Sequence, residues 1–156
     1  MNRKIFLDEL AIFTIGFPFV LFKLLLGFIF FKIFGAPANL IVGSLLILWA
    51  IIDFFINGLN LIFLVFKNRY LTDACLLTII FAGCRAKISD KDAGKEFGTA
   101  IDAMLSCTIV AIIVGGDLFD YMSDLESILW SVSVVVNVMG AGITRILLSV
   151  GVGDGS

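Results

Sequence analysis

Long apolar runs, separated by short clusters of charged residues, dominate the chain. Four of these runs lie at about 10–34, 38–66, 97–117 and 126–150, and each is long enough to cross a membrane. A hydrocarbon core about 30 Å thick requires roughly 20 helical residues. The pattern therefore predicts an all-α polytopic membrane protein, with four transmembrane helices in a single membrane domain that covers 1–156.

A fifth apolar stretch, inside 70–87, is shorter than the others. Its uninterrupted part, Ala74–Cys84, has 11 residues, a length typical of an interfacial or re-entrant element. A fifth span here would place the cations from Arg85 to Lys95 outside, although basic loops normally stay cytoplasmic. We therefore expect four spans plus one short interfacial helix, with re-entrant insertion left open as the alternative.

Local signals indicate where several helices begin and end. Breakers in the turn 35–38 predict a tight hairpin between the first two spans. Ser123–Glu126 matches a capping box, so span four is expected to begin near Asp124. A looser version of the same motif predicts that span three continues a cytoplasmic helix that starts near Asp90.

Composition and charge agree with a membrane protein. Hydrophobic residues make up 60% of the chain, against about 45–50% in soluble domains. The net charge of −2 conceals a segregation of charges along the chain. The loop 67–96 is rich in cations, whereas all charged residues of the loop 117–126 are acidic. The charge rule then places both termini and the loop 67–96 in the cytoplasm, in a bacterial inner membrane. The first span is too long for a cleaved signal peptide and contains Lys23, so we expect it to be retained.

One stripe of the second span carries a carboxylate and two amides. Asp53, Asn57 and Asn60 stand at i, i+4 and i+7, which is one face of a helix. Lys23 lies 14 residues before Pro37 and Asp53 lies 16 after it, so the two share one depth to within about 3 Å. Because a lone charge in the bilayer normally faces a partner, the spacing predicts an ion pair, with Asn57 completing its hydrogen bonds.

The role of this intramembrane pair has two interpretations. In one, the pair is structural and holds the hairpin in register. In the other, it is an ion or proton site that Asn57 and Asn60 extend along the helix. Gly16 and Gly27 lie on the Lys23 face and would let the two helices approach closely.

Spans three and four also present ordered faces. Span four places Ser133, Asn137, Gly140 and Thr144 on one side. Asn137 and Thr144 are expected to form one polar layer with Asn57 and Asn60 of span two. Small residues at an i+4 spacing allow close helix packing, within or between subunits. In span three they form one ladder: Ala103, Cys107, Ala111 and Gly115.

Signals for catalysis and for metals are weak. The chain has no His, and Cys75, Cys84 and Cys107 lack the paired spacing of a zinc site. The acids near 90–94 lack the third ligand and the closing Glu of a calcium loop. No nucleophile is paired with a base. We therefore expect no enzyme, no metal and no cofactor.

The basic loop 67–96 has two interpretations. Its cations can fix topology and touch anionic lipid. Alternatively, Arg85, Lys87, Lys91 and Lys95 form a docking platform for a cytosolic protein. Acids are interleaved with these cations, a mixture that suits a protein partner better than direct nucleic-acid binding.

Two classes of function fit a chain with so little mass outside the membrane. One is a non-enzymatic homo-oligomeric subunit that senses membrane state and docks a cytosolic protein. The other is a small ion channel, holin-like pore or ion carrier. Ion flux into liposomes that contain the purified protein separates the two classes.

The order of segments resembles that of the membrane subunit of the Kiwa anti-phage defence system. The shared features are a cytoplasmic N-terminus, a tight first hairpin, the basic stretch 67–97 and the acidic outer loop 117–126. The resemblance covers the whole chain as architecture and carries over no site residue. It implies a homotetramer that senses membrane disturbance during infection and binds a cytosolic DNA-binding effector.

Overall fold

A computed structural model describes most of the chain. It covers residues 10–33, 37–67, 75–85 and 91–151, and excludes the side chains at 82–85, 91–96, 99, 144–145 and 148–151. Every element in these ranges is helical, and the described residues contain no strand. In chain order the elements are η1 (Ile12–Gly16, a π-helix), α2 (Phe17–Ile33), α3 (Pro37–Lys67), α4 (Leu76–Arg85), α5 (Lys91–Gly115), η2 (Leu118–Tyr121, a 3₁₀-helix) and α6 (Asp124–Gly151).

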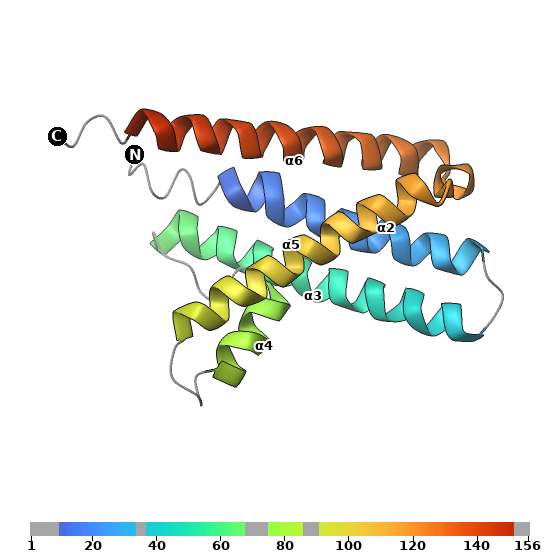
Figure 1. The fold of residues 1–156 in the computed structure, drawn as a ribbon, viewed down its shortest axis with the longest axis horizontal. Helices are drawn as coiled ribbons and strands as arrows, with labels where there is room; N and C mark the ends of the chain where they lie inside the picture. The colour runs from blue at the N-terminus through green and yellow to red at the C-terminus, as the bar shows by residue number, and fades with distance from the viewer. Residues whose placement is uncertain (1–9, 34–36, 68–74, 86–90, 152–156) are drawn as a thin grey trace.

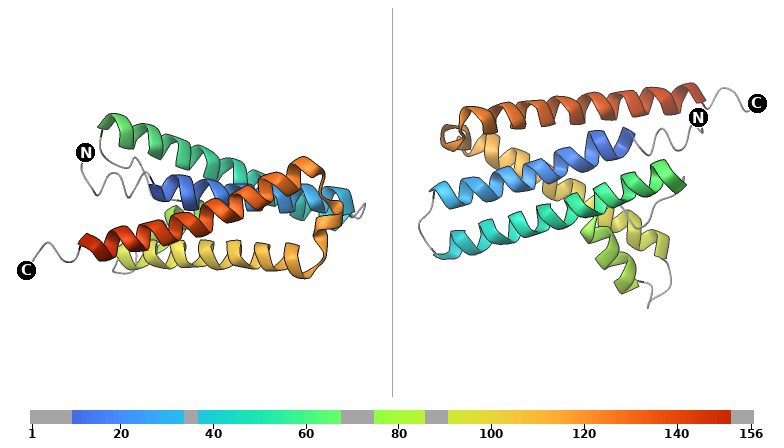
Figure 2. Two further views of the ribbon diagram at one scale, coloured as in Figure 1. Left: turned by 90° about the horizontal axis from the view of Figure 1, so that it is seen from above. Right: turned by 180° about the vertical axis from the view of Figure 1, so that it is seen from behind.

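Helix α2 is the centre of the arrangement. It forms an antiparallel hairpin with α3 on one side and packs against α6 on the other (Figure 1). Helix α5 crosses this layer, and α4 packs against α5 to form a second hairpin that projects from the bundle (Figure 2). The sequence therefore predicted the first hairpin correctly, and α3 starts with a proline in the first helical turn, where the missing N–H costs nothing.

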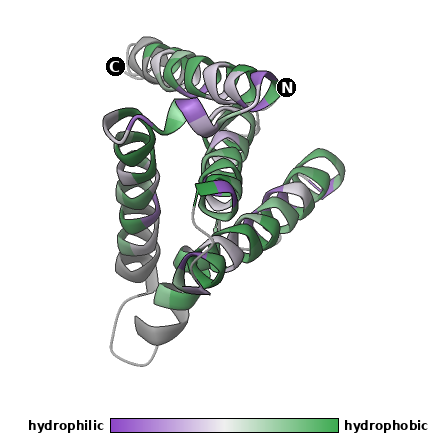
Figure 3. Ribbon diagram, turned by 90° about the vertical axis from the view of Figure 1, so that its right-hand side faces the viewer, coloured by the Kyte–Doolittle hydropathy of each residue, from purple (hydrophilic) through white to green (hydrophobic). Residues whose placement is uncertain are grey.

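Three helices are long and apolar enough to cross a membrane. They are Ile12–Ile33, Pro37–Lys67 and Asp124–Ile143, whereas the apolar part of α5, Ala100–Gly115, is shorter. Hydrophobic residues run along the helices (Figure 3), and many of them are exposed, such as Phe55 of α3 at 62%. Such continuous exposed apolar faces favour a membrane location. The all-helical class is as predicted, with three helices meeting the length and hydropathy expected of a span.

The predicted helix ends agree with the structure. Helix α6 begins at Asp124, where the Ser123 N–H and hydroxyl both donate to the Glu126 carboxylate at 2.7 and 2.8 Å. Lys32, at the end of α2, also donates to this carboxylate and ties the hairpin tip to the capping box. Helix α5 starts at Lys91 and continues without a break through the third apolar run, as the looser capping signal indicated.

The apolar core lies where α2, α5 and α6 meet. Phe22 of α2 packs on Trp130 of α6 with ring centroids 4.9 Å apart, and Ile113 of α5 is fully buried beside them. In hydrocarbon, burying apolar side chains brings no gain from leaving water, so close van der Waals fit and polar contacts hold such helices together. The polar and glycine contacts therefore carry much of the fold's specificity.

Glycines mark the closest helix contacts. A Cβ on Gly27 would lie 2.7 Å from Ile47, and one on Gly43 would lie 2.9 Å from the Gly27 carbonyl oxygen. A Cβ on Gly140 of α6 would lie 2.0 Å from the Cβ of Thr14. Gly27 therefore faces α3 as predicted, and Gly140 allows α6 to approach η1.

The small-residue ladder of span three does not pack against another helix of the same chain. Cys107, Ala111 and Gly115 are exposed, and Ala103 is half-buried. The buried face of α5 lies about one residue, or roughly 100°, away around the helix. It consists of Asp102, Ser106, Ile109 and Ile113. The part of the prediction that placed the ladder within the chain is corrected, and contact between subunits stays a prediction.

The contact between Gly140 and Thr14 yields a matched test within α6. Gly140→Ala places a methyl group against the Thr14 side chain, so we expect a loss of about 1–3 kcal/mol, typical of overpacking. Gly142→Ala is the control, because a Cβ there meets nothing within 4 Å. It should be neutral, or stabilise by up to about 1 kcal/mol through helix propensity. Thermal unfolding in detergent measures both, and equal shifts would contradict the described contact.

Candidate functional site

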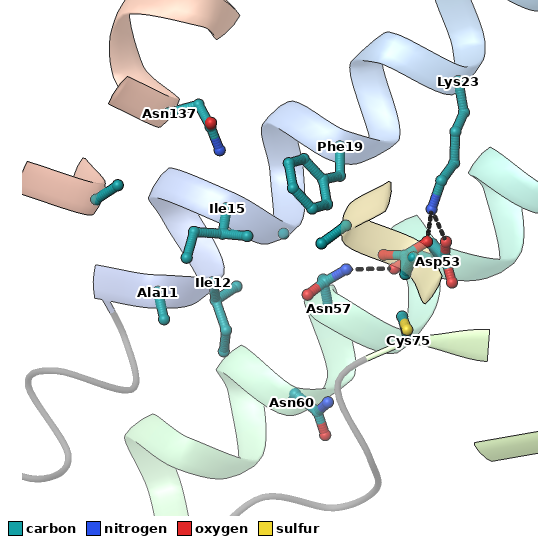
Figure 4. A pocket seen from close by; sticks show the side chains of 14 residues that line it. Ala11, Ile12, Ile15, Phe19, Lys23, Asp53, Asn57, Asn60, Cys75 and Asn137 are labelled. Carbon is teal, nitrogen blue, oxygen red and sulfur yellow. Dashed lines mark hydrogen bonds and ion pairs between the residues drawn. The ribbon is translucent and has the colours of Figure 1, made fainter. Parts of the chain in front are cut away.

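Lys23 is the centre of a buried polar cluster halfway along the bundle. Its ammonium donates to Asp53 Oδ2 of α3 at 2.7 Å and to Asp102 Oδ1 of α5 at 2.5 Å. The side chain has no exposed surface, and Asp53 is 1% exposed. We call Lys23, Asp53 and Asp102 the triad; Figure 4 shows Lys23 reaching down between the helices to these carboxylates.

A tryptophan covers the remaining side of the ammonium. The Lys23 Nζ atom lies 4.3 Å from the centroid of the Trp49 ring of α3. A desolvated cation over an indole face gains about 2 kcal/mol. Lys23 is therefore enclosed by two carboxylates and one aromatic face.

Asp53 also fixes the start of α4. Its Oδ1 atom accepts the backbone N–H of Leu76 at 2.8 Å, while Oδ2 binds Lys23. A carboxylate at a helix N-terminus satisfies an N–H that the helix itself leaves unpaired. A side chain from the first hairpin therefore caps a helix in the second hairpin.

This cap determines where the short helix begins along α3. Asp53 stands 16 residues after the start of α3 and 14 before its end, so α4 begins at mid-length of α3. The interfacial and the re-entrant interpretations of α4 both stay predictions.

The third member of the triad, Asp102, was missed from the sequence, although depth would have revealed it. Lys23 lies 10 residues from the end of α2 at Ile33, and Asp102 lies 13 residues from the end of α5 at Gly115. Both ends face the acidic side of the protein, so the two residues share a depth of about 15–20 Å. Asp102 directly precedes Ala103, the first residue of the small-residue ladder.

The predicted polar layer is only partly assembled. Asn57 donates to the Asp53 backbone oxygen at 2.8 Å, so it does not complete the hydrogen bonds of the ion pair as expected. Asn60 is fully buried one turn further along. Asn137 instead donates to the Thr14 carbonyl at 3.0 Å and joins α6 to η1. The side chain of Thr144 lies outside the described residues.

The triad forms the floor of a cavity of about 440 Å³. Its walls are mostly apolar and come from η1, α2, α3, α5 and α6, with the charged groups at the Lys23 end and Asn60 and Asn137 away from it (Figure 4). The lining residues are Ala11, Ile12, Ile15, Gly16, Phe19, Lys23, Asp53, Asn57, Asn60, Cys75, Asp102, Ala103, Asn137 and Ala141. The cavity has the size and mixed lining of small-molecule sites.

The predicted docking cations lie on the second hairpin or next to it. Arg85 is the last residue of α4, and Lys91 and Lys95 are in the first turns of α5. Their side chains, and the whole of Lys87, lie outside the described residues. The structure thus places three of the four backbones on the hairpin that Asp53 caps.

The triad has no counterpart in the comparisons made. Searches against protein-family models, curated proteins and solved structures find no match to this chain. Within the described ranges, no group of three or more His, Cys, Asp or Glu side chains could hold a metal ion. Function is therefore inferred from the geometry of the triad and from the distribution of charge.

The presence of Asp102 changes how the intramembrane ion pair should respond to mutation. Lys23→Met removes the shared cation, and breaking a buried pair typically costs about 3–5 kcal/mol. The double variant Lys23→Met/Asp53→Asn should recover only part of this loss, because Asp102 stays buried without its donor, at about 1–3 kcal/mol. Adding Asp102→Leu should recover most of the remainder.

Melting temperature and expression level across this series provide the measurement. Asp120→Asn, which changes an exposed residue of η2, is the control and should alter neither. Asn at position 53 still accepts the Leu76 N–H, so the cap on α4 is retained. Full recovery in the double variant would mean that Asp102 does not depend on Lys23.

Proposed function

We propose that this chain is a non-enzymatic, oligomeric subunit of a bacterial inner membrane, which senses membrane state and docks a cytosolic protein. The observation that carries the proposal is the hydrogen bond from the Leu76 N–H to Asp53. It ties the lipid-facing first hairpin to the second hairpin, α4–α5, on which the docking cations lie. A shift of α2 against α3 would change how Asp53 is held, and therefore how α4 is held.

In this proposal the chain has four spans, because α5 crosses the membrane in addition to the three long apolar helices. At 25 residues, α5 is about 37 Å long, sufficient for a hydrocarbon core. Asp102 makes α5 less apolar than the other long helices, but its carboxyl group is not isolated, because it lies 2.5 Å from the Lys23 ammonium. Both termini and the segment around Lys91 would be cytoplasmic, and α4 would enter the membrane from that side as a re-entrant helix.

Homo-oligomerisation is also part of the proposal. The exposed ladder from Ala103 to Gly115 would supply a closely packed face between subunits. The likeness to the Kiwa membrane subunit supports a tetramer and a role in phage defence, with a cytosolic effector as the docked protein. In this proposal the effector contacts nucleic acid, and this chain does not.

Cysteine labelling in intact cells tests the topology. In a variant without the three native cysteines, a single cysteine at Lys91 or Ser156 should resist an impermeant reagent, and one at Asp120 should react. The positive-inside rule is the physical basis for this expectation. Labelling of position 91 from outside would overturn the four-span arrangement, and detergent-permeabilised cells control for buried positions.

Co-purification from native membranes tests docking. Changing Arg85, Lys87, Lys91 and Lys95 together to Gln should abolish capture of a cytosolic protein that the wild-type chain retains. Arg3→Gln/Lys4→Gln is the matched control, because it removes cations from another cytoplasmic segment and should retain capture.

Coupling between the triad and docking is tested in the same assay. Asp53→Ala removes the acceptor for the Leu76 N–H, so it should reduce capture although every docking cation is intact. Capture that depends on the cations but is unchanged by Asp53→Ala would mean docking without coupling to the membrane helices. Capture that is unchanged in the four-cation variant would contradict docking at this hairpin.

A further inference from the structure

The charges that line the cavity do not balance. Its ionisable lining residues are Lys23 from α2, Asp53 from α3, Asp102 from α5, and Cys75 just before α4. Helix α6 contributes Asn137 and Ala141, which carry no charge. With both acids ionised, one ammonium would face two carboxylates within 2.7 Å of its nitrogen.

An excess carboxylate in such surroundings is unfavourable. Burial disfavours an unpaired charge, and two carboxylates that share one site resist joint ionisation. Lys23 already donates to both acids, and its third side faces the Trp49 ring. Neutrality therefore requires one further positive charge, and a proton is the smallest group that can supply it.

We propose that the triad binds one proton, taken from bulk water and held on the carboxyl group of Asp102. Asp53 is the less suitable of the two acids to hold the proton, because it accepts two N–H donors, from the Lys23 ammonium and from the Leu76 backbone. Its position at the N-terminus of α4 further favours a negative charge. Asp102 shares the ammonium with Asp53 and contacts the Cys75 thiol, a weaker donor than an N–H, and within the described residues it has no backbone donor and lies at no helix N-terminus.

A nearby hydroxyl provides an unused acceptor on the same face. Ser106 lies one turn beyond Asp102 on α5 and is 1% exposed. Among the described residues its Oγ has no hydrogen-bond partner. A buried hydroxyl rarely remains unpaired. Asp102 and Ser106 stand four residues apart on one face of α5, so the hydroxyl is a neighbouring group able to accept a hydrogen bond from a protonated carboxyl group.

The cavity provides the route by which this proton exchanges with water. It extends from the triad to Ala11 beside η1 and to Ala141 of α6. Asp102 lies on its lining, so a proton that enters the cavity reaches this carboxyl group directly. The inference does not depend on docking of a cytosolic protein.

Infrared spectroscopy of the purified, full-length protein at neutral pH tests this assignment. A protonated carboxyl group has a C=O band separate from that of carboxylates, and incorporation of isotope-labelled aspartate should shift it. In the variant Asp102→Glu, the band should instead follow labelled glutamate. A band that still follows labelled aspartate in this variant would place the proton on Asp53 and overturn the assignment.

Two further variants keep the proposal falsifiable if Asp102→Glu does not fold. Asp102→Asn leaves one cation and one carboxylate, so the band should be lost. Asp120→Asn changes an exposed acid and should leave the band unchanged. Absence of the band from folded wild-type protein, its persistence in Asp102→Asn, or its loss in Asp120→Asn would each contradict a proton on Asp102.

Discussion

Complete burial of the Lys23 ammonium is the constraint on which the rest of the arrangement depends. A cation without exposed surface is stable only when anions and an aromatic face replace its water. Three helices supply these groups: α3 gives Asp53 and Trp49, and α5 gives Asp102 to the lysine of α2. The requirement fixes the register of α2 against α3 and brings α5 across both.

Apolar packing complements this polar contact but does not replace it. In a hydrocarbon environment, a leucine on a helix gains little by facing another helix instead of lipid. Specific close contacts between helices therefore form at glycines, which have no side chain. Gly27 contacts Gly43 in this way, and Gly140 contacts Thr14. The Asn137 amide adds a directional contact to the Thr14 carbonyl. These contacts orient α3 and α6 on the two sides of α2.

The same triad connects the membrane hairpin to the segment that carries the basic residues. Asp53 accepts one donor from α2 and one from the start of α4, so any change in the first contact alters the electrostatic environment of the second. In the proposed function, a small motion between α2 and α3 would thus bias the position of the α4–α5 hairpin. Coupling of this kind needs two arrangements of similar energy. The triad, which has two acids for one lysine, is suited to provide them.

Much of the architecture followed from the sequence because helical geometry is regular. A fixed rise per residue let residue counts from Pro37 place Lys23 and Asp53 at one depth, and they lie in contact. Local capping chemistry likewise determined where α6 begins, since Ser123 and Glu126 are neighbours on one turn.

Rotation about each helix axis was decided only by tertiary structure. The small residues of α5 suggested one packed face, but the need of Lys23 for a second carboxylate turns Asp102 inward, and most of the ladder faces outward. The depth of α4 was equally open, because a short apolar helix can lie at an interface or enter the membrane. Its position depends on Asp53, 23 residues earlier in the chain, and such a pairing of distant groups leaves no local pattern in the sequence.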